Sequence, residues 1–171
     1  MPTNTLLGEA LTAWQDAREG VIAEVNNIPD DDFSYRPTEA NRTLGELVLH
    51  IVQSGLLMSG ELSRPDGDFR RHPDYSGFYE EYMAALEGKT KKSELLELLT
   101  TTHKRGSQQL EDAGEIQMLQ LIRQFNGVYA TRLSWMNHAI AHEEYHRGQI
   151  ALYARQVGCV PALTQLIYGS G

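Results

Sequence analysis

The chain has a single cysteine, no long apolar run and a shortage of positive charge, and each shortage disfavours a class of protein. Cys159 alone cannot form a disulfide within the chain, which fits a reducing compartment. No stretch approaches the about 18 apolar residues of a membrane span, and "MPTNTLLGEALTAWQ" has no signal-peptide pattern. Lysine and arginine total 15 against 23 acidic residues, and the net charge of -8 disfavours nucleic acids and anionic membranes as partners. We therefore expect a cytoplasmic protein.

What the chain does contain is enough apolar material for one domain. It has 171 residues, of which 41% are hydrophobic and 22% are charged, as is usual for a globular protein. No internal repeat, low-complexity tract or linker interrupts it. We therefore expect a single domain over residues 1–171.

Four long segments carry apolar residues at spacings of three and four, which is typical of amphipathic helices. They cover about residues 5–27, 44–62, 92–112 and 132–157. Thr43 and Glu46 form a capping-box signature at the start of the second segment. Gly114 follows the third segment, and Thr131 and Gly158 bracket the fourth.

The segments between these helices are shorter and less regular. Residues 63–90 predict a long connection with a short helix at about 77–86, which Gly88 ends. Asn126 and Gly127, between partly alternating apolar residues, predict a hairpin with a type I′ turn. The expected fold is therefore an all-α four-helix bundle with a small hairpin before helix four. The C-terminal tail is expected to pack on the body or on a partner chain.

Three of the six histidines fall in one stretch, "HAIAHEEYHRGQI", at His138, His142 and His146. At about 100° per residue they share one helix face, opposite a polar face. A buried imidazole needs a hydrogen bond or a metal, and histidines four residues apart can converge on one ion. Four more side chains near this face are candidate pocket residues: Trp135, Tyr145, Gln149 and Tyr153.

A stable metal site needs a further ligand from another helix, and three histidines are available. His50 is the strongest candidate because it lies in mid-helix on an apolar face. His72 falls in a loop, and His103 is expected to be exposed because Lys104 and Arg105 follow it. A hydrogen-bonded core role is the alternative interpretation for any buried histidine.

The letters "HEEYH" also match the HExxH pattern of zinc proteases, in which the glutamate is a general base. Glu143 would take that role here, and Glu46, one turn before His50, is a second candidate base. HExxH enzymes draw a third ligand from downstream, but no His, Asp or Glu follows His146. The protease interpretation is therefore disfavoured, and Glu143 is equally a residue that flanks the site.

Three of these motifs together resemble the DinB-like superfamily. "HAIAHEEYHRGQIALYARQVGCVP" is similar to its last bundle helix, which carries H-x-x-x-H-R-G-Q before an arginine, a glycine and a proline. "RTLGELVLHIVQS" is similar to its second helix, with one histidine in the middle, and "FSYRPTEANRT" resembles the segment before it. The resemblance extends from about Leu6 to Pro161. It implies a four-helix bundle of the DinB/YfiT type.

The resemblance also implies a divalent metal, zinc or nickel, held by His50, His142 and His146, with His138 outside the ligand set. Relatives include S-transferases that use low-molecular-weight thiols such as bacillithiol, mycothiol or glutathione. The implied function is metal-dependent transfer of such a thiol to a small-molecule electrophile. Hydrolysis by metal-activated water and non-catalytic metal binding or ligand sensing are the alternatives. A homodimer is expected on the same basis.

Overall fold

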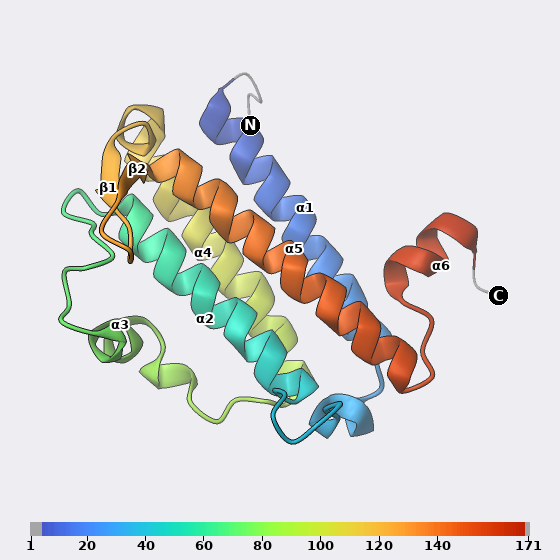
Figure 1. Ribbon diagram of the computed structural model, residues 1–171. Helices are drawn as coiled ribbons and strands as arrows, with labels where there is room; N and C mark the ends of the chain where they lie inside the picture. The colour runs from blue at the N-terminus through green and yellow to red at the C-terminus, as the bar shows by residue number, and fades with distance from the viewer. Residues whose placement is uncertain (1–4, 170–171) are drawn as a thin grey trace.

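Four long helices form the body of the molecule in the computed structural model, which describes residues 5–169 (Figure 1). They are α1 (Leu6–Asn27), α2 (Leu44–Ser63), α4 (Lys92–Met118) and α5 (Arg132–Gln156). The predicted four-helix bundle is confirmed, and the ends of α1, α2 and α5 agree with the prediction to within a residue. Within the described part of the chain, no helix is both long and apolar enough to cross a membrane.

The helix ends follow the capping signals of the sequence. The Thr43 hydroxyl accepts a hydrogen bond from the Glu46 N–H, and the Glu46 carboxylate accepts one from the Thr43 N–H at 2.8 Å. The Thr131 hydroxyl accepts from the Ser134 N–H at 3.1 Å and so caps α5. Gly158 follows α5 with a φ of 86°, which glycine adopts at little cost.

Helix α4 is longer than the sequence indicated. Gly114 has a φ of 78° and a ψ of 161°, so the regular helix breaks there as predicted. Helical structure then resumes as far as Met118, whose side chain is completely buried. The extra turn also brings Glu115 to the start of α1, where its carboxylate accepts from the Leu7 N–H at 3.1 Å. An additional buried side chain and a cap for α1 therefore account for the difference.

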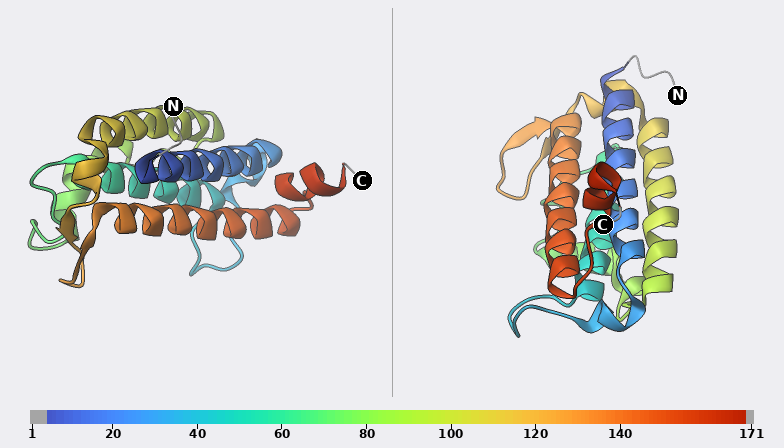
Figure 2. Two further views of the ribbon diagram at one scale, coloured as in Figure 1. Left: turned by 90° about the horizontal axis from the view of Figure 1, so that it is seen from above. Right: turned by 90° about the vertical axis from the view of Figure 1, so that its right-hand side faces the viewer.

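Each long helix packs on two others, and helices that follow one another in the chain are not always neighbours. α1 and α2 both lie against α4 and α5, so α1 and α2 face each other across a diagonal of the bundle (Figure 2). α1 and α5 run in the same direction, and α2 and α4 run together in the opposite direction (Figure 1). This topology places α2 and α5 side by side and antiparallel.

The connection between α2 and α4 returns along the length of the bundle, because these two helices are parallel (Figure 1). It contains α3 (Tyr75–Tyr82) and a 3-10 turn, η2 (Ala84–Leu86). Phe78 and Met83 from this connection are buried in the core. The long connection is confirmed, and the short helix begins slightly earlier than predicted and is interrupted at Met83.

The predicted hairpin is present, but its turn type was wrong. β1 (Leu121–Arg123) and β2 (Tyr129–Thr131) pair antiparallel, with Arg123 opposite Tyr129. A type I′ turn needs positive φ at both Asn126 and Gly127, yet the positive-φ residues among those described are all glycines. The Gly127 N–H instead bonds to the Gln124 carbonyl at 2.9 Å, which makes Gly127 the last residue of a longer turn. The longer loop removes the need for a left-handed asparagine.

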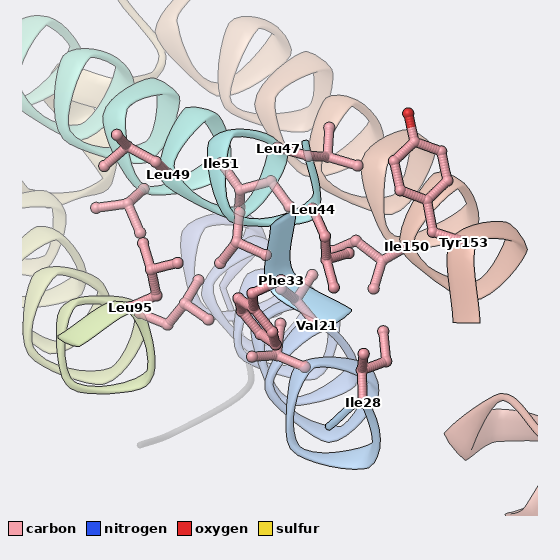
Figure 3. Packing of buried hydrophobic residues seen from close by; sticks show 14 of the residues in the cluster. Val21, Ile28, Phe33, Leu44, Leu47, Leu49, Ile51, Leu95, Ile150 and Tyr153 are labelled. Atoms are coloured by element: carbon pink, nitrogen blue, oxygen red, sulfur yellow. The ribbon is translucent and has the colours of Figure 1, made fainter. Parts of the chain in front are cut away.

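Two apolar clusters fill the bundle, one toward each end. In the first, Phe33 from the 3-10 turn η1 (Asp30–Ser34) inserts between the helices, while the oxygen of Tyr153 points out of the cluster (Figure 3). The second lies near the hairpin and includes Leu57 and Met136. Along α5, His142 and His146 fall between residues of the two clusters, whereas His50 of α2 lies among residues of the first cluster.

The C-terminal tail forms α6 (Ala162–Tyr168), which stands off the end of the bundle (Figure 2). Glu24 of α1 holds its first turn by accepting from the N–H groups of Ala162 at 2.8 Å and Leu163 at 3.2 Å. The tail therefore packs on the body, one of the two expected arrangements. Most of its apolar side chains remain exposed, including Leu166 and Tyr168.

Candidate metal centre

Three imidazoles meet on the seam between α2 and α5. His50 comes from the middle of α2, and His142 and His146 come from adjacent turns of α5. The His142 Nε2 atom lies 3.3 Å from the His50 Nε2 atom and 3.0 Å from the His146 Nε2 atom. One nitrogen of each ring lies within 4.8 Å of the other two, and no carboxylate or thiol of the described residues joins the group. The structure thus brings together the three histidines that the sequence singled out.

These nitrogens can share one metal ion, whereas hydrogen bonds do not pair all of them. Nitrogens bound to zinc at about 2.0–2.1 Å in a tetrahedral site lie roughly 3.3 Å apart. Hydrogen bonding alone leaves a conflict, because the single Nε2 atom of His142 faces two other Nε2 atoms. Three imidazoles suit zinc, nickel, copper or iron. The donor set therefore fits a divalent ion without selecting one.

Gln149 sets the protonation of one ring nitrogen. Its side-chain oxygen lies 2.7 Å from the His146 Nδ1 atom, one turn along α5. Because an amide oxygen can only accept, Nδ1 of His146 carries the proton and donates it. The Nε2 lone pair of His146 is then free and directed toward the other two rings.

Burial keeps the three rings in the form that binds metals. Loss of solvent is the largest cause that lowers the pKa of His50 to about 3 and of His142 to about 4, and it lowers the pKa of His146 as well. The positive charge of Arg42 adds to the lowering at all three rings. All three imidazoles are therefore neutral at pH 7 and offer lone pairs.

Both carboxylates that the sequence marked as candidate bases have structural partners. Glu143 is only 3% exposed and forms an ion pair with Arg18, and it also accepts from the Trp14 Nε1–H at 2.9 Å. Glu46 is exposed and completes the capping box at the start of α2. Neither is part of the histidine group. A role as general base would require either residue to leave these partners.

Of the five candidate pocket residues, two line a cavity and three do not. Trp135 and His138 line a cavity beside the histidines, and their rings stack with centroids 4.5 Å apart. Gln149 contacts His146 as described above. Tyr145 is exposed and places its ring 5.1 Å from that of His146, and Tyr153 lies in the first apolar cluster. The two tyrosines do not line the cavity.

The cavity has a volume of about 260 Å³ and opens beside His50 and His142, toward the hairpin. Its walls are mainly apolar, with aliphatic side chains from α2, α4 and α5, and Ser54 and Ser59 add hydroxyl groups. Aromatic side chains close much of the remainder: Trp14, Tyr75, Phe125 and Trp135. Phe125 belongs to the hairpin loop and Tyr75 to the start of α3, so elements outside the bundle complete this site.

The expectation that His103 is exposed was wrong. Its side chain is 6% exposed, and its ring meets the ring of Trp14 edge to face at 4.4 Å. Lys104 and Arg105 follow it directly, but on a helix they point about 100° and 200° away. The helical period held the correct signal, because His103 continues the buried series of Leu95, Leu99, Gly106 and Leu110.

Sequence reasoning also missed two arginines near the site. Arg18 is 1% exposed, and its Nη1–H donates to the Leu99 carbonyl at 3.0 Å while the rest of the guanidinium faces Glu143. Its position between Trp14 and Val21 on the apolar face of α1 was the available signal. Arg42 is exposed near the histidines and has no ion-pair partner within residues 5–169.

In this four-helix bundle α1 runs parallel to α5, and α2 runs parallel to α4. Together with the three imidazoles between α2 and α5, this arrangement defines a class of four-helix proteins with a histidine site. The chain matches the DinB family over residues 1–168, and it belongs to that family. A search of curated proteins finds no match. The predicted family is thus confirmed.

Solved structures that share the fold include proteins from two bacilli. The DinB-like protein YjoA of Bacillus subtilis is 23% identical over 88% of this chain and 92% of its own, with a TM-score of 0.67. A DinB-like protein of Bacillus cereus is 18% identical over 89% and 93%, with a TM-score of 0.67. YfiT of Bacillus subtilis is 15% identical over 89% and 87%, with a TM-score of 0.69. YfiT is described as a probable metal-dependent hydrolase with an unusual four-helix bundle topology. At these identities the likeness establishes the fold.

Proposed function

We propose that this protein is a metal-dependent enzyme in which His50, His142 and His146 hold one divalent ion, zinc or nickel. The observation that carries the proposal is the convergence of three Nε2 atoms with no hydrogen-bonding pattern that satisfies them together. An ion with three neutral ligands keeps its full charge and supplies a Lewis acid that lowers the pKa of a coordinating thiol or water. The adjoining apolar cavity gives room for a second reactant.

Transfer of a low-molecular-weight thiol to an electrophile is the reaction that we favour. A thiol has a pKa of about 8.5 and water about 15.7, so a thiol needs far less help from a general base. Both candidate bases, Glu46 and Glu143, are engaged elsewhere. In an addition, the sulfur bonds to an electrophilic carbon and the thiol proton ends on the product, so no oxidant is required.

The chain offers separate places for the two reactants. The mainly apolar cavity would hold the electrophile beside His50 and His142. Arg42, exposed and without an ion-pair partner among the described residues, is available for a carboxylate of a thiol such as bacillithiol, mycothiol or glutathione. A homodimer and a cytoplasmic location, where such thiols are reduced, are part of the same proposal.

A metal-dependent hydrolase is the second candidate, because YfiT, which shares the fold, is described as one. This function needs a general base for water. Glu143 would have to separate from Arg18 and Trp14, and Glu46 would have to leave the capping box.

Metal analysis tests the site itself. We expect the purified protein to carry one equivalent of a divalent metal, and His142→Ala and His50→Ala to lose it. His138→Ala is the matched control, since His138 lies one turn earlier on α5 but outside the cluster, and this variant should keep its metal. Stoichiometric metal in the folded His142→Ala protein would refute the site.

Activity measurements then distinguish the candidate reactions. A panel of low-molecular-weight thiols with a chromogenic electrophile should show thiol-dependent turnover that His142→Ala abolishes and His72→Ala leaves unchanged. Turnover of a simple ester without any thiol would instead establish the hydrolase. A metal-loaded protein that is silent in both assays would point to metal binding or ligand sensing.

A further inference from the structure

Most polar side chains that line the cavity beside the histidines already have a partner within the chain. Those that take part in a hydrogen bond are Trp14, Ser59, Tyr75 and Glu143. His50 and His142 belong to the metal cluster, and the ring nitrogen of Trp135 is inaccessible to solvent. Ser54 and His138 remain, because no hydrogen bond or ion pair joins either side chain to another of residues 5–169.

Both remaining side chains can be reached by a molecule in the cavity. His138 is exposed and Ser54 is partly exposed. Among the described residues, the buried side-chain polar atoms without a partner are Nε of Arg132 and Nε1 of Trp135, so the Ser54 hydroxyl is not closed off from solvent. Serine has a single heavy-atom torsion, which lets its oxygen turn toward a ligand. The His138 ring is held by its stack on Trp135, with 13° between the ring planes.

The two side chains lie at the same level on facing helices. Ser54 follows His50 by one turn of α2, and His138 precedes His142 by one turn of α5. Because α2 and α5 are antiparallel, both steps lead toward the hairpin end of the bundle (Figure 1). Residues four apart share a helix face and are about 6 Å apart along the axis. Since the Nε2 atoms of His50 and His142 are 3.3 Å apart, Ser54 and His138 form the next polar level of the same seam.

The chemistry of this pair matches one oxygen acceptor. A serine hydroxyl and an imidazole N–H each donate one hydrogen bond, and a carbonyl oxygen has two lone pairs to receive them. The cavity wall is mainly apolar, and none of its described residues is a lysine or arginine that could pair with a carboxylate. The site therefore fits a neutral carbonyl compound whose apolar remainder occupies the cavity of about 260 Å³.

We infer that Ser54 and His138 together bind the carbonyl oxygen of the electrophile, with its carbonyl carbon turned toward the histidine cluster. This inference rests on the proposed function and names the class of its second substrate, a neutral carbonyl compound. Two hydrogen bonds at the oxygen draw electrons from the carbonyl carbon and favour attack on it. In the addition, sulfur bonds to this carbon, one carbon–oxygen electron pair moves to the oxygen, and the thiol proton ends there.

Binding of three probes of similar size tests this inference on the full-length protein. Acetophenone is a neutral carbonyl compound, cumene has the same shape without an acceptor, and benzoate is an anion. Titration calorimetry should show saturable binding of acetophenone both before and after metal removal by a chelator. Cumene should bind about 10- to 100-fold more weakly, the effect of two hydrogen bonds. Benzoate should not bind once the metal is removed.

Two substitutions assign the binding to the pair. Ser54→Ala removes only the hydroxyl, and His138→Phe removes the nitrogens while keeping a ring to stack on Trp135. Each should weaken acetophenone binding about three- to tenfold and leave both cumene binding and metal content unchanged. The double variant should bind acetophenone no better than cumene. Ser134→Ala is the matched control, because Ser134 is exposed one turn before His138 and does not line the cavity.

Several results would overturn the inference. They are unchanged acetophenone affinity in either single variant, equal binding of acetophenone and cumene, failure of acetophenone to bind, and equally tight binding of benzoate to the metal-free protein. The outcome is separable from that of the proposed function, because binding is measured without a thiol. Acetophenone binding that depends on the pair, without thiol-dependent turnover, would keep the subsite and refute the transferase. Turnover in a protein that binds no acetophenone would do the reverse.

Discussion

Two neighbouring residues of α5, His142 and Glu143, are buried in different ways. Glu143 has both carboxylate oxygens occupied, by Arg18 and by the Trp14 Nε1–H. His142 directs its Nε2 atom toward two other imidazole nitrogens. The first site satisfies its polar groups within the chain, whereas the second does not. Burial alone therefore does not distinguish a functional residue from a structural one in this bundle. The better guide is a buried nitrogen, such as Nε2 of His142, whose hydrogen bonds the chain does not complete.

The two sites also connect different helices. The Arg18–Glu143 pair joins α1 to α5, and the Arg18 bond to the Leu99 carbonyl extends it to α4. The histidine cluster joins only α2 and α5 and borders the cavity. The ion pair is therefore a structural crosslink between three helices, and the cluster depends on an added ligand for completion.

The largest effect is expected from breaking the ion pair. Glu143→Leu leaves the Arg18 charge buried without a partner, and removal of one member of such a pair costs about 3–5 kcal/mol. We expect urea unfolding to show a loss of this size, while the metal content of the folded fraction stays near one equivalent. Arg18→Met should show a similar loss.

The double variant Arg18→Met with Glu143→Leu is the control for this interpretation. It removes both charges, so its stability should lie well above that of either single variant. Additive losses in the double variant would mean that the two side chains act independently.

A smaller effect, confined to the metal site, is expected from Gln149. Gln149→Leu removes the acceptor that holds the His146 Nδ1–H, and such a loss lowers metal affinity by about 10- to 100-fold. Competition with a chromophoric chelator measures this affinity. The stability of the metal-free protein should change little, because Gln149 is a partly exposed residue.

Gln149→Glu supplies the matched comparison, because a carboxylate also accepts from Nδ1. We expect it to retain the affinity that Gln149→Leu loses. Equal metal affinity in all three proteins would show that the Gln149 contact does not orient His146.

The helices and their ends were predictable because they depend on local pattern. Apolar spacing located the four helices, and the capping box at Thr43 and the glycine at 158 mark ends that the structure shares. Where a contact between distant parts of the chain determines the extent of an element, the local sequence pattern did not predict it. The turn of helix beyond Gly114 exists because Met118 enters the core, and the length of the hairpin loop set the turn type at Asn126.

The candidate site was only partly predictable, for the same reason. The pair on one helix follows from the spacing of His142 and His146, but the partner His50 lies 92 positions away. Its position in mid-helix on an apolar face made it the strongest candidate for a third ligand, and the family resemblance then joined it to them. The rotation of α1 against α5 decides that Glu143 meets Arg18, 125 positions earlier, and no local pattern in the sequence specifies that rotation.

The comparison can also be tested at a third buried polar group, His103. Its protonation should not change the free energy of unfolding at neutral pH. Desolvation, followed by the nearby charge of Arg18, lowers its pKa from 6.5 to about 4 in the folded protein. Between these values the unfolded chain binds the proton more readily, so this contribution to stability is complete above pH 6.5 and is lost as pH falls toward 4. We expect His103→Phe to unfold with a weaker pH dependence over this window.

The difference between the wild-type and His103→Phe stability curves isolates this contribution. His50 and His142 also have lowered pKa values, but they titrate in both proteins, and metal-free samples remove any effect of bound metal. A constant offset above pH 6.5 reports altered packing against Trp14, whereas a difference that changes as pH falls reports the proton. Parallel curves from pH 7 to 4 would show that His103 gains a proton as easily inside the bundle as in the unfolded chain. In that case burial of the His103 ring would not lower its pKa, in contrast to the desolvation that the structure indicates.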